Sequence, residues 1–268
     1  MSTGTGIARR RWATTLGALV FALGLASAAC DESPTSATGT GDPGGGSSGS
    51  SLPPTTANLS GTRFLAFGDS ITAGEVTAPV NGVSAGPLVV VPSASYPTQL
   101  QDRLKSRYTS QAGQISVMNA GAPELASAAF PRLADLLANA ARGVDALLLL
   151  DGAEDLLNYG ANGVSAAIKG MNDLAREGRR RGARVYIAYL PPSIQGRQRS
   201  VPDAAIRAYN DELSIIVRGE GAVGVDLYAA LSQDLNRYIG VDGLHPTEAG
   251  YRRIADEFLA SIASTLER

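Results

Sequence analysis

Short aliphatic runs alternate along this sequence with longer segments whose apolar residues recur at helical spacing. The runs are continuous rather than interrupted by polar residues, which is typical of strands buried on both faces of a parallel sheet. A chain with this alternation is predicted to fold as α/β, with helices packed on the sheet. Five parallel strands are expected, at residues 64–67, 115–119, 146–150, 185–189 and 223–226.

The carboxyl ends of such strands are where a ligand site is expected, because loops, helix N-termini and free backbone N–H groups converge there. Ser70 follows the first strand, Gly121 the second and Glu154 the third. His245 directly precedes the last helical segment. These residues are therefore the first candidates for a functional site.

The N-terminus resembles an export signal. Three arginines precede an apolar run at residues 16–25, and the small residues 26–29 follow it. This pattern predicts a cleaved signal peptide at residues 1–29. An uncleaved transmembrane anchor is the alternative, but the apolar run is short for a bilayer, which needs about twenty residues. We therefore expect an exported protein.

Cys30 is the only cysteine, so no disulfide can form within the chain. Its position after small residues resembles a bacterial lipobox, although Leu25 stands further from the cysteine than is usual. Lipidation of Cys30 would anchor the protein to a membrane of the cell envelope; cleavage without lipidation would secrete it with a free thiol. Residues 31–60 are rich in Ser, Thr, Gly and Pro, which predicts a disordered linker after Cys30. The folded domain is then expected at residues 61–268.

Charge and composition argue against two classes of partner. Removal of the signal peptide leaves 20 basic and 25 acidic residues, so nucleic acid is not an expected partner. With one histidine and one cysteine, the chain lacks the nitrogen and sulfur ligands of common metal sites, and no metal is predicted.

Two short segments at opposite ends of the domain carry candidate chemistry. Gly68, Asp69 and Ser70 follow the first strand, and Asp242 precedes His245, the only histidine. Either segment alone is more often a turn. Together they satisfy one mechanism: a serine nucleophile needs a base such as histidine, and a carboxylate fixes the imidazole tautomer. The sequence thus predicts Ser70, Asp242 and His245 as a catalytic triad.

From residue 63 onward the sequence resembles the GDSL/SGNH hydrolase family. Residues 67–74 (FGDSITAG) resemble its nucleophile block, and residues 241–251 (VDGLHPTEAGY) resemble the block that holds the other two triad residues. The resemblance implies a three-layer, flavodoxin-like α/β/α fold with a sheet of about five parallel strands. It also implies hydrolysis of esters or thioesters through an acyl-serine intermediate, without a metal or organic cofactor.

The family's oxyanion hole combines the serine N–H, a glycine N–H after the second strand and an asparagine side chain after the third. Here Glu154 stands in place of the asparagine. The family glycine would fall near Glu124, so either Gly121 has taken its role or the loop has lost a residue. The resemblance therefore assigns the oxyanion hole to Ser70, Gly121 and Glu154. An ionised Glu154 would oppose an oxyanion, whereas a protonated one could donate a hydrogen bond.

The leading hypothesis is an envelope esterase acting on lysophospholipid-like, short-acyl or O-acetylated carbohydrate esters. A non-catalytic or weakly active binding module with a degenerate oxyanion hole is the alternative, and an acyltransferase would use the same residues. The sequence does not choose among substrates. The loop at residues 191–202, with Arg197 and Arg199, could line a substrate entrance but is interpreted as solvated.

Overall fold

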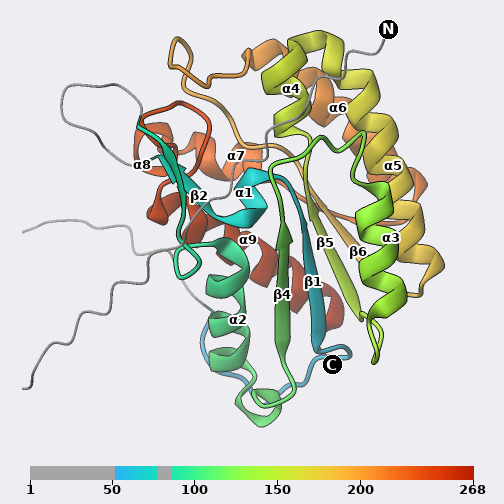
Figure 1. Ribbon diagram of the computed structural model, residues 1–268. Coiled ribbons are helices and arrows are strands. Elements are labelled where there is room, and N and C mark those ends of the chain that lie inside the picture. Colours follow the sequence, from blue (N-terminus) through green and yellow to red (C-terminus); the bar gives the residue numbers. More distant parts are fainter. Residues whose placement is uncertain (1–51, 78–85) are drawn as a thin grey trace, which may run out of the picture. The chain divides into compact units, whose positions relative to one another are not determined.

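The computed structural model describes residues 52–77 and 86–268, which form a parallel five-stranded sheet in the order β4-β1-β5-β6-β7 (Figure 1). All five expected strands are present, with ends within two residues of the prediction. They are β1 (Arg63–Gly68), β4 (Ser116–Gly121), β5 (Ala146–Leu150), β6 (Arg184–Ala188) and β7 (Val223–Val225). β1 and β5 are paired in register from Phe64 opposite Ala146 to Gly68 opposite Leu150.

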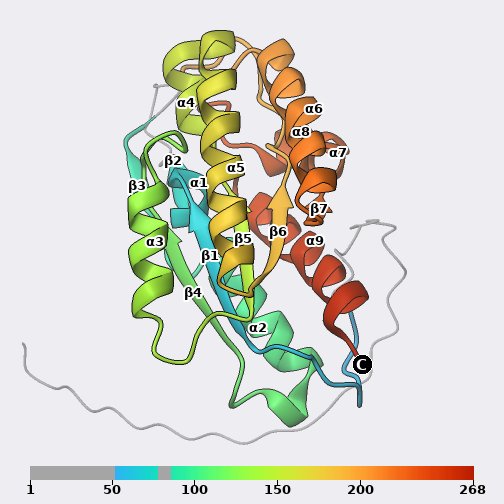
Figure 2. The same cartoon turned by 90° about the vertical axis from the view of Figure 1, so that its right-hand side faces the viewer.

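Helices cover both faces of this sheet, which confirms the α/β fold with flanking helices (Figure 2). On one face, α2 (Tyr96–Arg107) packs against α9 (Glu248–Leu266). On the other face, α5 packs between α3 and α6. The bounds of these three helices are α3 (Phe130–Asn139), α5 (Val164–Arg180) and α6 (Asp203–Gly219).

Several shorter elements were not anticipated, because they are too brief to show a hydrophobic period. An antiparallel hairpin pairs β2 (Glu75–Thr77) with β3 (Leu88–Val90). The remaining short elements are α1 (Ser70–Ala73), α4 (Ala153–Tyr159), α7 (Leu227–Ser232), α8 (Leu235–Tyr238) and the 3₁₀ turns Thr109–Gln111 and Gly160–Gly163. Most of them lie in the connections that follow the strands.

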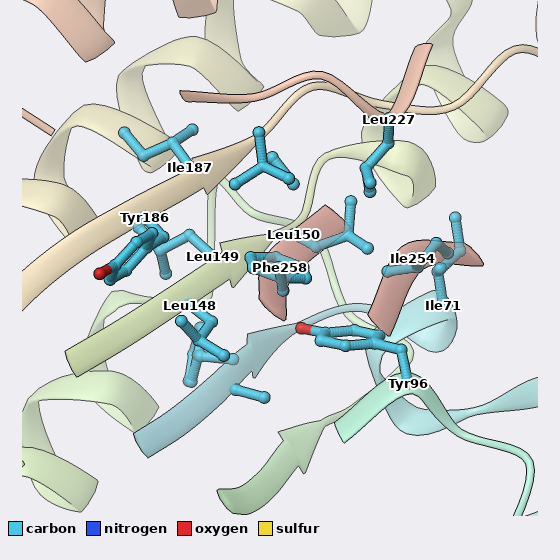
Figure 3. Close-up of a cluster of buried hydrophobic side chains, with 14 of the residues drawn as sticks. Ile71, Tyr96, Leu148, Leu149, Leu150, Tyr186, Ile187, Leu227, Ile254 and Phe258 are labelled. Atoms are coloured by element: carbon cyan, nitrogen blue, oxygen red, sulfur yellow. The ribbon is translucent and has the colours of Figure 1, made fainter. Parts of the chain in front are cut away.

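The core lies between the sheet and its helices (Figure 3). Every residue of β5 is buried, as expected for a central strand covered on both faces. Tyr96 of α2 and Phe258 of α9 stack with ring centroids 5.1 Å apart, a geometry favourable for aromatic pairs. These contacts fix α9, and with it the segment that carries His245, against the sheet.

The folded part begins before residue 61, earlier than the composition suggested. Leu59 is buried in the core and forms a bridge with Glu267, and the Ser60 N–H donates to the Leu266 carbonyl at 2.8 Å. Burial of Leu59 offsets the entropy of ordering this short stretch, so the end of the expected linker belongs to the domain. The expected signal peptide, Cys30 and most of the linker lie outside the described residues. Within the described ranges, no helix has the length and apolar character needed to cross a membrane.

Candidate active site

The turn after β1 places Ser70 at the carboxyl edge of the sheet. A side chain at Gly68 would lie 1.7 Å from the Leu150 carbonyl oxygen, so the close approach of β1 and β5 requires glycine there. Asp69 caps α1, because its Oδ1 accepts the Ile71 N–H at 3.0 Å. Ser70 is the first residue of α1 and therefore has a backbone N–H with no intrahelical acceptor.

The loop before α9 is organised by the Asp242 carboxylate. Its Oδ1 accepts the backbone N–H groups of Leu244 and His245, both at 3.0 Å. Thr247 then caps α9 by accepting the Gly250 N–H at 3.1 Å. This arrangement holds His245 between the turn that Asp242 stabilises and the capped N-terminus of α9.

The structure brings the three predicted triad residues together, although Ser70 and His245 are 175 positions apart in sequence. His245 Nδ1 lies 2.6 Å from Asp242 Oδ2, and His245 Nε2 lies 3.0 Å from Ser70 Oγ. An ionised carboxylate only accepts hydrogen bonds, so Nδ1 carries the proton and Nε2 is free to accept from the serine. All three side chains are fully buried, which strengthens these hydrogen bonds.

The surroundings of Asp242 keep it ionised. Burial alone would raise the pKa of Asp242, but hydrogen bonds from His245 and the Leu244 N–H outweigh burial and hold that pKa below its ordinary value. Arg199 also contacts it: Nη1 lies 3.6 Å from Asp242 Oδ2, and the Arg199 N–H donates to the Asp242 carbonyl at 2.8 Å. The interpretation of the loop as solvated is thus wrong for Arg199. For Arg197 it agrees with the structure, in which Arg197 is exposed.

The predicted oxyanion donors differ in their availability. The Gly121 N–H donates to Asn119 Oδ1 at 2.9 Å, and a side chain at Gly121 would lie 2.0 Å from the Ala73 nitrogen. Gly121 therefore allows β4 to approach α1, and its N–H is already engaged, contrary to the expected role. The Glu124 N–H is engaged as well, with the Ala122 carbonyl at 2.7 Å. Of the backbone groups considered, the Ser70 N–H remains free to bind an oxyanion.

Glu154 lies in the first turn of α4 and is half-buried. Its carboxylate makes no hydrogen bond or ion pair within the described ranges. The negative charge of Glu154 acts on Asp69. Asp69 is fully buried, and its Oδ2 accepts the Ala153 N–H at 2.9 Å. Burial, and after it the nearby charge of Glu154, raises the pKa of Asp69 to about 7 despite its two backbone hydrogen bonds.

Two buried acids beside the site were assigned no role from the sequence. Asp155 Oδ2 accepts the Ala126 N–H at 2.7 Å and Oδ1 accepts the Ser127 hydroxyl at 2.8 Å, which ties the loop after β4 to α4. Asp151 Oδ1 accepts the Gly152 N–H at 2.7 Å, but its buried Oδ2 has no partner among the described residues. An acidic residue directly after a buried strand was the available signal for Asp151.

The free energy of unfolding is expected to fall as the pH rises from about 4 to about 7. Burial, together with the charge of Asp69, raises the pKa of Asp151 well above its usual value, and Asp69 itself is raised to about 7. An acid with a raised pKa holds its proton in the folded state after the unfolded chain has released it. The stabilisation is therefore complete below the pKa that the acid has in the unfolded chain. It is lost as the pH rises through the higher pKa that the acid has in the folded protein.

Asp151→Asn should consequently raise the unfolding free energy at about pH 8, by on the order of 1 kcal/mol or more, and change it little near pH 4. Urea unfolding at both pH values measures this. The exposed Asp211→Asn is the control with the same chemical change. Equal destabilisation by Asp151→Asn at both pH values would contradict the expected titration.

The sequence matches the GDSL-like lipase/acylhydrolase family over residues 66–253, which is more than half of the chain and includes all three triad candidates. The chain belongs to this family. Members of the family are ester-hydrolysing enzymes, and this protein is one of them. No curated protein matches the sequence.

Solved structures of other hydrolases share the fold. An α/β hydrolase enzyme from the metagenome of Lake Arreo has a TM-score of 0.58 at 20% identity, covering 77% of this chain and 97% of its own. The lipase/acylhydrolase from Enterococcus faecalis has a TM-score of 0.57 at 20% identity, with coverages of 76% and 97%. An acetyl-xylooligosaccharide esterase from Geobacillus has a TM-score of 0.59 at 20% identity, with coverages of 76% and 95%.

Proposed function

We propose that this GDSL-family chain hydrolyses carboxylic esters through a covalent acyl-serine intermediate at Ser70. The observation that supports the proposal is the chain of contacts from Ser70 Oγ through His245 to Asp242, with distances of 3.0 and 2.6 Å. A serine, a base within hydrogen-bond reach and a carboxylate that orients the base are the parts that nucleophilic acyl transfer requires.

The reaction follows from which atoms hold protons. His245 Nε2 takes the hydroxyl proton while Ser70 Oγ attacks the ester carbonyl carbon, and the positive imidazolium is stabilised by Asp242. His245 then gives that proton to the departing alcohol oxygen as the ester C–O bond breaks and the acyl-serine forms. Water repeats the cycle: His245 takes its proton, the hydroxide attacks the acyl carbon, and Ser70 Oγ leaves and regains a proton.

Stabilisation of the tetrahedral oxyanion is the weaker part of this mechanism. The Ser70 N–H is available, but the Gly121 N–H is engaged with Asn119. An anionic Glu154 beside the developing charge would raise the barrier. Because one lost donor costs about two to three orders of magnitude in rate, we expect slow turnover.

The acyl group is proposed to be short. One narrow apolar cavity is lined in part by residues that adjoin the triad in sequence, and it has no room for even a water molecule in the conformation described. Its lining includes Ile71, which follows Ser70, and Leu244, which precedes His245. An acetyl or butyryl group would displace fewer side chains than a long chain. The Geobacillus esterase of similar fold acts on acetyl-xylooligosaccharides, which agrees with a short-acyl or O-acetyl carbohydrate ester as substrate.

A fluorophosphonate probe and p-nitrophenyl esters test the proposal. The probe should modify Ser70, as located by peptide mass spectrometry, and Ser70→Ala should lose both the label and the hydrolysis. Ser232→Ala, which removes an exposed hydroxyl, should keep both. Acetate and butyrate esters should be hydrolysed faster than the octanoate ester. An unlabelled Ser70 in the wild-type protein would instead support a binding module that has lost catalysis.

The location of the protein is a separate proposal. We infer that Cys30 is acylated after export and anchors the enzyme to a membrane of the cell envelope. Two or more acyl chains give stable anchoring, so Cys30→Ala should move the protein from the membrane fraction to the soluble fraction. Cys30→Ser, which keeps the size but not the thiol, should behave in the same way. Membrane association that persists in both variants would favour an uncleaved apolar segment.

A further inference from the structure

A second pocket lies away from the triad, on the face of the sheet covered by α2 and α9. Both α2 and α8 pack against α9 (Figure 1), and a pocket of about 210 Å³ opens between the three helices. Its lining includes four arginines but neither Ser70 nor His245. The arginines are Arg103 from α2, Arg237 from α8, and Arg252 and Arg253 from α9.

The lining of the pocket carries a net positive charge. Asp256 is the one acidic residue in its lining, against four guanidinium groups, whereas the chain as a whole has a formal net charge of −2. Glu248 pairs with Arg252 and Glu257 pairs with Arg253, which neutralises part of this charge. The pair of Arg252 Nη1 with Glu248 Oε2 is long, at 3.7 Å, and both side chains are at least half exposed, so it contributes little.

Many guanidinium donors of these arginines have no acceptor among the residues that the structure describes. Arg103 is the best satisfied, through Asp256 Oδ1 at 2.6 Å and Gln99. Arg253 pairs with Glu257 at 2.7 Å through Nη2, but its buried Nε has no partner within the described ranges. Arg237 forms no ion pair there and lies over the Tyr238 ring. A buried donor without an acceptor is costly, so the Arg253 Nε favours an anionic ligand, and the exposed Arg237 guanidinium is free to bind the same anion.

We propose that this pocket binds a phosphate group, either as free phosphate or as the phosphodiester of a lipid headgroup. The planar fork of arginine matches phosphate oxygens in bidentate pairs, and several forks can share one tetrahedral anion. The pocket is large enough for a phosphate with a small substituent. The ligand would meet Arg237 and Arg252 first, because these two side chains are the most exposed of the four.

Calorimetry on the full chain at constant ionic strength tests this with two probes. Inorganic phosphate represents the free ion. Glycerophosphoglycerol represents the lipid headgroup and contains no carboxylic ester that the catalytic site could cleave. The double variant Arg237→Gln/Arg252→Gln should weaken binding of the preferred probe about tenfold or more, given the usual strength of hydrogen bonds to charged groups. Esterase activity should stay at the wild-type level, so the result is independent of the proposed function.

The control removes the same charge elsewhere: Arg142→Gln/Arg218→Gln changes two exposed arginines outside the pocket and should bind as the wild type does. Tighter binding of inorganic phosphate would identify free phosphate as the ligand, and tighter binding of glycerophosphoglycerol would identify the headgroup. No saturable binding of either probe up to about 10 mM would overturn the proposal. Equal loss in both double variants would overturn it too, because the effect would then be one of net charge.

Discussion

Asp242→Asn is expected to lower kcat for ester hydrolysis by about four orders of magnitude without unfolding the protein. In the structure, Asp242 Oδ1 accepts two backbone N–H groups while Oδ2 faces His245 Nδ1 at 2.6 Å. The asparagine oxygen would keep the two backbone bonds, which leaves its NH₂ group facing Nδ1. The imidazole would then carry its proton on Nε2 and could not accept one from Ser70.

Initial rates with p-nitrophenyl acetate, together with the rate of fluorophosphonate labelling, measure this loss. Both should fall, because both depend on removal of the Ser70 proton. Asp234→Asn makes the same chemical change at an exposed position eight residues earlier and should leave both rates unchanged. Urea unfolding of Asp242→Asn separates a wrong tautomer from a damaged fold. A fall of less than about tenfold in a folded Asp242→Asn protein would mean that Asp242 does not orient the base.

The sheet and the juxtaposition of Ser70, Asp242 and His245 were predictable because each has a signal that is local in sequence. A central strand that is buried on both faces is apolar at every position, so the run Ala146–Leu150 can be predicted as a strand from the sequence. Turn chemistry around Ser70 and the single histidine at position 245 narrow the candidates for a nucleophile and a base. Parallel topology then places both at the same edge of the sheet.

The contacts that shape the site were not predictable in this way, because they join segments far apart in the chain. Asp69 accepts the Ala153 N–H, and Arg199 reaches Asp242, through pairings set by how the loops pack. Leu59 is an example from the fold. A single apolar residue in a polar stretch shows no hydrophobic periodicity that would predict its burial, yet Leu59 is buried against the C-terminal helix. Gly121 is an example from the site. Its N–H donates to the Asn119 side chain, and the conformation of that side chain could not be predicted from the sequence.

Glu154→Asn is expected to raise the rate of ester hydrolysis by about tenfold or more, the reverse of the usual effect of a substitution in an active site. The Glu154 carboxylate has no cationic or donor partner within the described ranges. Burial chiefly raises the pKa of both Asp69 and Glu75, and the charge of Glu154 raises both further. Glu154 thus adds negative charge near Asp69, which directly precedes the proposed nucleophile, and we expect this charge to oppose the oxyanion of the transition state. Asparagine would remove that charge and supply an N–H donor in its place.

Glu154→Ala separates the two contributions, because it removes the charge without adding a donor. If repulsion dominates, the alanine and asparagine variants should gain activity equally; if the missing donor dominates, only asparagine should. Glu124→Gln, which neutralises an acid in the neighbouring loop, is the control for a general change in the potential. The variants should be compared by kcat/KM for p-nitrophenyl acetate, since an oxyanion donor stabilises the transition state rather than the bound ester. An unchanged rate in both Glu154 variants would show that this side chain does not face the oxyanion, and the slow turnover expected here would need another cause.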